Sequence, residues 1–162
     1  MLDLLSIAYE HQLLRAKQEL LNIELDEPEV ARMRGLERLL KGSYAGRAGK
    51  RVGSRLDSPM PVQFTLAGSF GSGEVHSVSA RGVAIVAARC LPNGARTVLR
   101  ISDHERGFEY VFPGKAIWTR GRVMGVAFDG VPARAPFAAP VSKRWGHSPV
   151  RFGEQRSEPM VA

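Results

Sequence analysis

The chain has 162 residues, 44% of them hydrophobic, with 17 glycines and 10 prolines. This length allows one core of ordinary size plus an appendage, and the glycine and proline content argues against an all-helical protein. The single cysteine excludes an internal disulfide, and the four histidines lack metal-ligand spacing. Without a signal-peptide pattern or a run of roughly 20 apolar residues, we expect a soluble cytoplasmic protein with no metal or cofactor.

The net charge of +7 is unevenly distributed. Residues 1–50 carry 8 Lys/Arg and 8 Asp/Glu, so the excess lies in residues 51–162, which carry 15 and 8. A basic region attracts phosphates through its long-range field and through arginine side chains. Nucleic acid, an anionic surface and a nucleotide are all candidate partners, and charge alone does not choose among them.

The first 42 residues have the pattern of a helical hairpin. Apolar residues recur at steps of three and four over residues 2–24, at Leu2, Leu5, Tyr9, Leu13, Ala16, Leu20 and Ile23. Asp26 and Glu29 fit a capping box with Pro28 in the first turn, which predicts a second helix over 27–41. The hairpin either covers one end of the next domain or serves for self-association or for binding a protein partner.

After a Gly/Ser/Ala-rich connector, the pattern changes to the alternation of short strands. The expected strands lie at 62–66, 74–78, 82–87, 97–101, 108–112, 115–120 and 122–128, where 108–112 and 115–120 form either one long strand or two joined at Pro113-Gly114. Six or so short strands at regular spacing predict a small closed barrel or a sandwich. Four prolines follow beyond residue 132, so we expect residues 133–162 to be mostly disordered.

Two motifs in the strand region resemble the signature of the PilZ domain family, an Arg-x-x-x-Arg followed by Asp/Asn-x-Ser-x-x-Gly. Arg51 and Arg55 form the first motif, and the segment from Ser77 to Gly82 matches the second, except that Ser77 replaces Asp or Asn. Ile117-Trp118 and the Gly-x-x-Phe at 125–128 are similar to the family's last two strands. The resemblance implies a mainly β fold with an α-helical N-terminal extension, in which residues 43–132 form a six-stranded antiparallel β-barrel.

The resemblance also implies a ligand, the bacterial second messenger cyclic di-GMP. Each arginine can bind a phosphate or a guanine edge through two parallel hydrogen bonds. The implied ligand-binding residues are Arg51, Arg55, Ser77, Ser79 and Gly82, with Lys50 and Arg81 as further candidates. By analogy with guanine-reading pairs, a serine in place of the carboxylate costs about 1 to 3 kcal/mol of binding, which weakens affinity without abolishing it.

Three functions remain open at this point. The first is a signalling adaptor in which cyclic di-GMP binding changes the domain arrangement; such PilZ proteins act on motility, surface polysaccharide or transcription through a protein partner. The second is a degenerate PilZ domain that does not bind nucleotide and acts as a protein-protein interaction module. Nucleic-acid binding by a basic barrel ranks last. Nothing in the sequence indicates catalytic residues, so we do not expect an enzyme.

Overall fold

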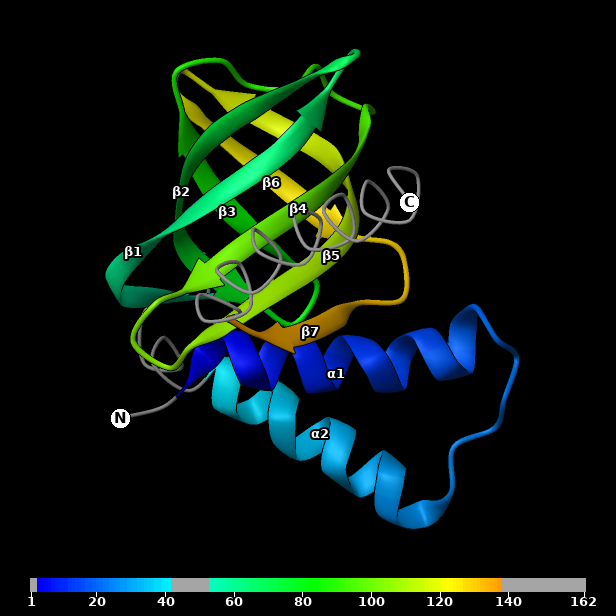
Figure 1. Cartoon of the computed structure of the whole chain (residues 1–162). Helices are drawn as coiled ribbons and strands as arrows, with labels where there is room; N and C mark the ends of the chain where they lie inside the picture. The colour runs from blue at the N-terminus through cyan, green and yellow to red at the C-terminus, as the bar shows by residue number, and fades with distance from the viewer. Residues whose placement is uncertain (1–2, 42–52, 138–162) are drawn as a thin grey trace, which may run out of the picture.

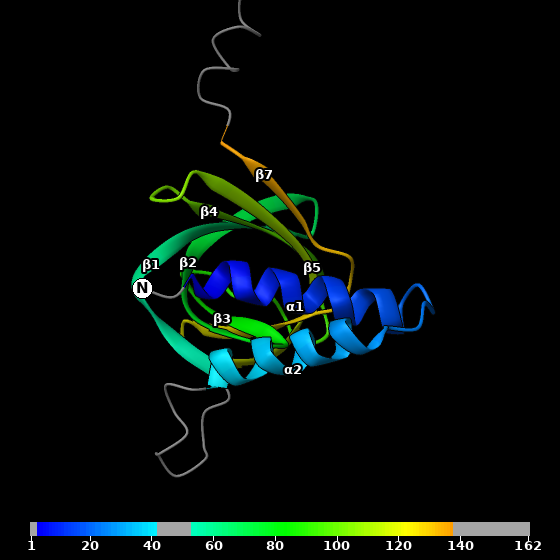
Figure 2. The same ribbon diagram turned by 90° about the horizontal axis from the view of Figure 1, so that it is seen from below.

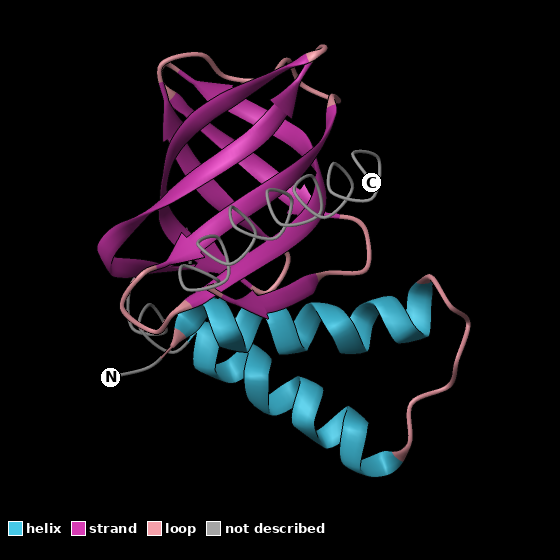
Figure 3. Cartoon of the chain, in the orientation of Figure 1, coloured by secondary structure: helices cyan, strands magenta, loops and turns pink. Residues whose placement is uncertain are grey.

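The computed structural model describes residues 3–41 and 53–137, in which two helices precede a series of strands (Figure 1). The helices are α1 (Leu4–Glu19) and α2 (Glu27–Lys41). The strands are β1 (Gly53–Leu66), β2 (Ser69–Ser79), β3 (Gly82–Ala87), β4 (Arg96–Asp103), β5 (Phe108–Arg120), β6 (Val123–Phe128) and β7 (Ala133–Pro136). Both helices lie at one end of the strands (Figure 3). Neither α1 nor α2 has the length and apolar character that crossing a membrane requires.

The strands form one antiparallel sheet in the order β4-β1-β2-β3-β6-β5-β7. An additional pairing between β4 and β5 closes strands β1 to β6 into a six-stranded barrel. Closure leaves these strands with partners on both sides, which removes the exposed edges of an open sheet. The predicted fold class, a mainly β protein with a helical N-terminal extension and a six-stranded antiparallel barrel, is confirmed.

Strand β7 lies beyond the predicted end of the barrel. It pairs with the first part of β5, from Phe108↔Pro136 to Val111↔Ala133, whereas β6 pairs with the second part. The prediction that disorder begins at residue 133 is therefore wrong for Ala133–Pro136. The long strand β5 leaves backbone groups beyond β6 that need hydrogen-bond partners, and β7 supplies them. The rest of the predicted tail, from residue 138, lies outside the described residues.

The barrel interior is built from the period-two pattern of its strands. Along β4, Leu99 and Ile101 are fully buried, whereas Val98, the residue before Leu99, faces outward and is 40% exposed. Aromatic rings fill the centre, where Phe112 stacks on Phe128 with ring centroids 4.3 Å apart. Alternation along each strand thus separates one inner face from one outer face, and the outer face is free to carry a site.

The helical hairpin lies across one end of the barrel, as the view along the barrel shows (Figure 2). Leu5 and Ala8 of α1 and Leu40 of α2 are fully buried and belong to the same core as the barrel residues. Of the two roles that the sequence left open for the hairpin, covering one end of the barrel is the one visible in the structure. The hairpin also contacts β1 and β2.

The ends of the two helices follow local capping rules. The Asp26 carboxylate accepts a hydrogen bond from the Glu29 backbone N–H at 2.8 Å, and the Glu29 carboxylate accepts one from the Asp26 N–H at 3.0 Å, which confirms the predicted capping box. Helix α1 ends at Glu19, earlier than the predicted residue 24. Asn22 turns the chain with a positive φ of 53°, so Leu20 and Ile23 of the predicted stripe are about half exposed.

Candidate ligand-binding face

The start of β1 and the end of β2 bring the two sequence motifs together. Arg55 on β1 pairs with Ser77 on β2, and Gly53 pairs with Ser79. The register therefore places Arg55 directly opposite the first residue of the second motif. Lys50 and Arg51 lie outside the described residues, so their place relative to Ser77 stays a prediction.

The Ser79 side chain holds the turn between β2 and β3. Its hydroxyl oxygen accepts hydrogen bonds from the backbone N–H groups of Arg81 at 3.3 Å and Gly82 at 3.1 Å, and the hydroxyl donates to the Gly82 carbonyl at 3.1 Å. Ser79 thus forms a local side-chain-to-backbone turn of the kind that serine favours. The Arg81 side chain is exposed beside this turn.

Gly82 is required by the close approach of two strands. It pairs with Ala127 on β6, and a Cβ atom at Gly82 would lie 2.2 Å from the Val126 carbonyl oxygen and 3.1 Å from the Ala127 Cα. These are backbone atoms of the barrel, which cannot move aside as a flexible side chain could. The requirement for glycine at this position is therefore the close backbone approach rather than a positive φ.

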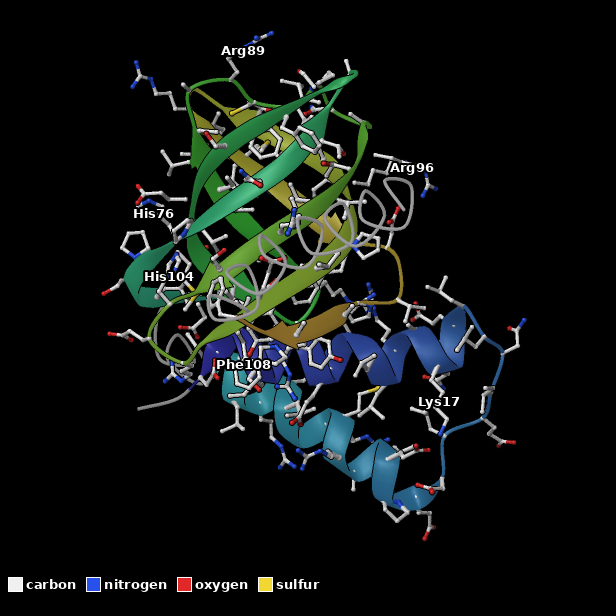
Figure 4. All side chains as sticks on the ribbon, viewed as in Figure 1. Lys17, His76, Arg89, Arg96, His104 and Phe108 are labelled. Carbon is white, nitrogen blue, oxygen red and sulfur yellow. The ribbon has the colours of Figure 1, made fainter. Side chains whose placement is uncertain are left out.

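Next to the paired motifs, β1 bulges away from β2. Between the pairs Arg55↔Ser77 and Met60↔Val75, β1 contains four residues, Leu56–Pro59, whereas β2 contains only His76. Strand β2 has a second irregularity at His76 in its pairing with β3, between Val75 and Ser77. Figure 4 shows His76 on the outside of the barrel beside β1. Bulges of this kind redirect side chains and occur often beside functional sites.

A chain of hydrogen bonds connects the Ser79 turn to helix α1. The Arg81 carbonyl accepts from the Phe128 N–H at 2.8 Å, and the Phe128 carbonyl accepts from the Arg15 guanidinium at 2.5 Å. Arg15 also donates to the Gln12 side chain at 3.0 Å, and Gln12 donates to the Gly130 carbonyl at 2.8 Å. The helix is therefore joined to the barrel by directional polar contacts as well as by apolar packing.

Arg15 and Gln12 are buried, a position that the apolar pattern of the helix does not predict. Arg15 is 8% exposed and Gln12 is 1% exposed. Burial lowers the pKa of Arg15 from its ordinary value, Glu19 opposes this shift, and nearby Arg81 adds to it. Their spacing is the one signal in the sequence, because residues 5, 8, 12, 15 and 16 lie on one helix face. A search for an apolar stripe overlooks polar residues on that face.

A second buried contact joins the two helices. The His11 ring, which is fully buried, lies 2.9 Å from the Glu37 carboxylate. The hydrogen bond with His11 holds the pKa of Glu37 below its ordinary value of 4.5, with burial opposing the shift. Because His11 lies on α1 and Glu37 on α2, this pair holds the two helices of the hairpin together. Among the described residues, no group of three or more His, Cys, Asp or Glu side chains could hold a metal ion.

Comparison with known proteins assigns the chain to a family. The PilZ domain family matches residues 47–136, which is more than half of the chain. The chain is therefore a member of the PilZ domain family, as the two motifs predict. The match extends past residue 132 to the end of β7, so the PilZ domain of this chain includes that strand beside the six-stranded barrel.

Three solved structures are similar to the chain at low identity. They are the PilZ domain of CeSA from a cellulose-synthesizing bacterium (16% identity, TM-score 0.38), the MrkH–c-di-GMP complex of K. pneumonia (8%, 0.41) and the Bacillus subtilis inhibitor of motility MotI/DgrA (17%, 0.39). The alignments cover 48%, 63% and 65% of this chain and 81%, 42% and 52% of those chains. The chain thus spans about half or less of the last two. No curated protein matches the chain. The family assignment rests on the 47–136 match.

Proposed function

We propose that the protein is a cyclic di-GMP receptor that acts as a bacterial signalling adaptor. The observation that carries this proposal is the strand register, which pairs Arg55 with Ser77 and Gly53 with Ser79 in a chain of the PilZ family. In this arrangement the backbone of Arg55 lies beside that of Ser77, the first residue of the second motif. A ligand with two phosphates and two guanines suits a pair of arginine forks next to a hydroxyl-bearing turn.

The residues would have different roles in binding. Arg51 and Arg55 would contact phosphates or guanine edges, with Lys50 and Arg81 adding positive charge. Ser77 would contribute one hydroxyl where the family has a carboxylate or an amide. The Ser79 hydroxyl is already used within its turn, so Ser79 and Gly82 would act mainly by presenting the backbone of residues 79–82 to the ligand.

We further propose that binding changes how the hairpin sits on the barrel. Residues 42–52, which include Arg51, join Lys41, the last residue of α2, to Gly53, the first residue of β1. A ligand that holds Arg51 therefore acts directly on the helix. A second route is the hydrogen-bond chain from the Ser79 turn through Phe128 to Arg15. An order-disorder change of a segment is a common mechanism for such a switch.

Isothermal titration calorimetry with cyclic di-GMP tests the site. We expect saturable binding by the wild type and its loss in Arg51→Ala and Arg55→Ala. Arg89→Ala, which removes the same charge near the opposite end of the barrel from the helices (Figure 4), is the matched control and should bind normally. Full affinity in both of the first two variants would exclude the arginine pair as the site.

The alternative is a degenerate PilZ domain that works as a protein-protein interaction module, and Ser77 is the observation that favours it. In that case the wild type would show no binding, and Ser77→Asp would create it. The receptor proposal instead predicts that the wild type binds and that Ser77→Asp tightens binding modestly. The exposed apolar residues of the α1–α2 connection, Leu20, Leu21 and Ile23, would be the first candidates for a contact with a protein partner or a second copy of the chain.

A further inference from the structure

Exposed arginines gather at the end of the barrel that lies opposite to the helical hairpin. We call this surface the distal end, and it consists of the connections at residues 67–68, 88–95 and 121–122 (Figure 1). Arg89 lies in the second connection, as Figure 4 shows, and Arg122 lies in the third, next to Arg120 at the end of β5. The Ala87 N–H donates to the Arg122 carbonyl at 2.8 Å, so the end of β3 and the β5–β6 turn are in contact.

The positive charge of the distal end is not neutralised within the part of the chain that the structure describes. The side chains of Arg89, Arg120 and Arg122 are exposed, and none of them forms a salt bridge there. The three connections contain no Asp or Glu. Hairpin residues 3–41, at the other end, carry 6 Lys/Arg and 8 Asp/Glu, a net charge of −2. The charge is therefore polarised along the molecule, and such a distribution orients a protein in the field of an anionic surface.

An aromatic side chain protrudes at the same end. Phe70 follows the tight 67–68 turn, in which Ala67 and Gly68 have φ values of 36° and 82°. It pairs with Thr65 on β1, and its side chain is 75% exposed, more than any other exposed large hydrophobic residue of the described chain. A two-residue hairpin turn fixes the strands on either side of it, so the sheet holds Phe70 outward. Burying such a ring in an apolar phase outside the molecule is favourable.

The shape of the distal end suits a flat surface. It consists of turns that project from the closed barrel, so several of them can meet one plane at the same time (Figure 1). The surface of an anionic membrane attracts basic residues, and the boundary between its headgroups and acyl chains accepts an aromatic ring. Single-stranded nucleic acid, in contrast, binds along basic grooves with several stacking rings. One aromatic residue at a hairpin tip among arginines therefore favours the membrane.

We propose that the distal end docks the protein on a membrane surface that contains anionic lipid. Arg89, Arg120 and Arg122 contact the lipid headgroups, and Phe70 inserts at the boundary between headgroups and acyl chains. In this orientation the hairpin and the Ser79 turn, which lie at the other end of the barrel, point away from the lipid and stay open to solution. The docking does not depend on the proposed receptor function, because the distal end and the paired motifs are separate surfaces.

Co-sedimentation with lipid vesicles tests the docking. We expect the wild type to bind vesicles of phosphatidylglycerol mixed with phosphatidylcholine, to release them as salt rises, and not to bind vesicles of phosphatidylcholine alone. One basic residue near an anionic surface corresponds to about a fivefold change in partitioning, so Arg89→Ala with Arg122→Ala should lower it about 30-fold. Arg120 is left in place because its guanidinium also lies 5.9 Å from the Trp118 ring centroid.

The matched control removes two arginines from the hairpin. Arg34 and Arg38 of α2 are likewise exposed and outside every salt bridge of the described residues. Arg34→Ala with Arg38→Ala changes the net charge equally but should leave partitioning near the wild-type value, because charges beyond a Debye length from the lipid are screened. Equal losses in both double variants would show attraction by net charge alone and overturn the proposal, as would a wild type that does not bind the anionic vesicles.

Variants of Phe70 test the insertion of its ring. Burial of a large apolar side chain corresponds to about a tenfold change or more, so Phe70→Ala should lower partitioning by about that factor, whereas Phe70→Leu should stay near the wild type. Wild-type partitioning of Phe70→Ala would overturn the insertion. Binding of a single-stranded DNA oligonucleotide through Arg89 and Arg122, without vesicle binding, would make the distal end a nucleic-acid site instead. Calorimetry with cyclic di-GMP on the same variants should give wild-type affinity, which separates this proposal from the receptor function.

Discussion

Gly82 lies where two strands approach too closely for a side chain. Its hypothetical Cβ atom meets the backbone of β6 at 2.2 Å, and the neighbouring Ser79 hydroxyl contacts both the N–H and the carbonyl of Gly82. Both residues belong to the motif that the family associates with ligand binding, and both also hold the β2–β3 turn in place. Loss of ligand binding on mutating either residue would therefore not by itself show direct contact with the ligand.

Gly82→Ala should destabilise the barrel without any ligand present. Because the clash is with backbone atoms, we expect a cost at the scale of overpacking, about 1 to 3 kcal/mol in the free energy of unfolding. Gly35→Ala is the control, since a Cβ atom at Gly35 in α2 meets nothing within 4 Å. That variant should gain up to about 1 kcal/mol from helix propensity. Urea unfolding measures both, and equal stability of the two variants would contradict the close approach at Gly82.

Helix α1 shows why its packing could be predicted only in part. The apolar period indicates a helix with one buried face, and Leu5 and Ala16 are indeed buried. Gln12 and Arg15 share that face because two carbonyl groups need donors, that of Phe128 at the end of β6 and that of Gly130 in the β6–β7 connection. Those carbonyls are more than a hundred residues away in sequence. A pattern within one helix contains no information about them.

Arg15→Ala should weaken the attachment of the hairpin. The substitution leaves the Phe128 carbonyl and the Gln12 side-chain oxygen without their donor, which costs about 1 to 3 kcal/mol for buried groups. Arg32→Ala removes an exposed ion pair with Glu10 from the same hairpin and should cost less than about 1 kcal/mol. Chemical unfolding compares the two. A cost for Arg15→Ala no larger than that for Arg32→Ala would show that Arg15 does not anchor the helix.

The contact between Glu37 and His11 should make hairpin stability depend on acid pH. The folded-state pKa of Glu37 lies below its ordinary value of 4.5, so the contact stabilises fully above that value and is lost as pH falls through the folded-state pKa. Glu37→Gln removes this dependence. We expect the stability difference between wild type and Glu37→Gln, measured by urea unfolding from pH 7 to pH 3, to shrink on the acid side. A constant difference would contradict this role.

At the scale of the whole molecule, the barrel follows from local signals, but the surface it creates does not. Turn residues and alternating strands predict a small closed barrel or a sandwich, and the resemblance to the PilZ family adds the six-stranded barrel and a site shared by Arg55 and Ser77. The pairing of strand β7 depends on the relative lengths and register of β5 and β6. Register follows from barrel closure and bulges, which no single segment specifies.

The proposed receptor function is tested most directly by a calorimetric titration of the purified wild-type chain with cyclic di-GMP at near-physiological salt, with GTP as the control ligand. We predict saturable binding that is selective for the cyclic dinucleotide, because Arg55 pairs with Ser77 next to the Ser79 turn in a chain of the PilZ family. Absence of binding by a protein shown to be folded would contradict the account. Ser77 would then mark a PilZ barrel that has lost its ligand and is retained for a protein partner.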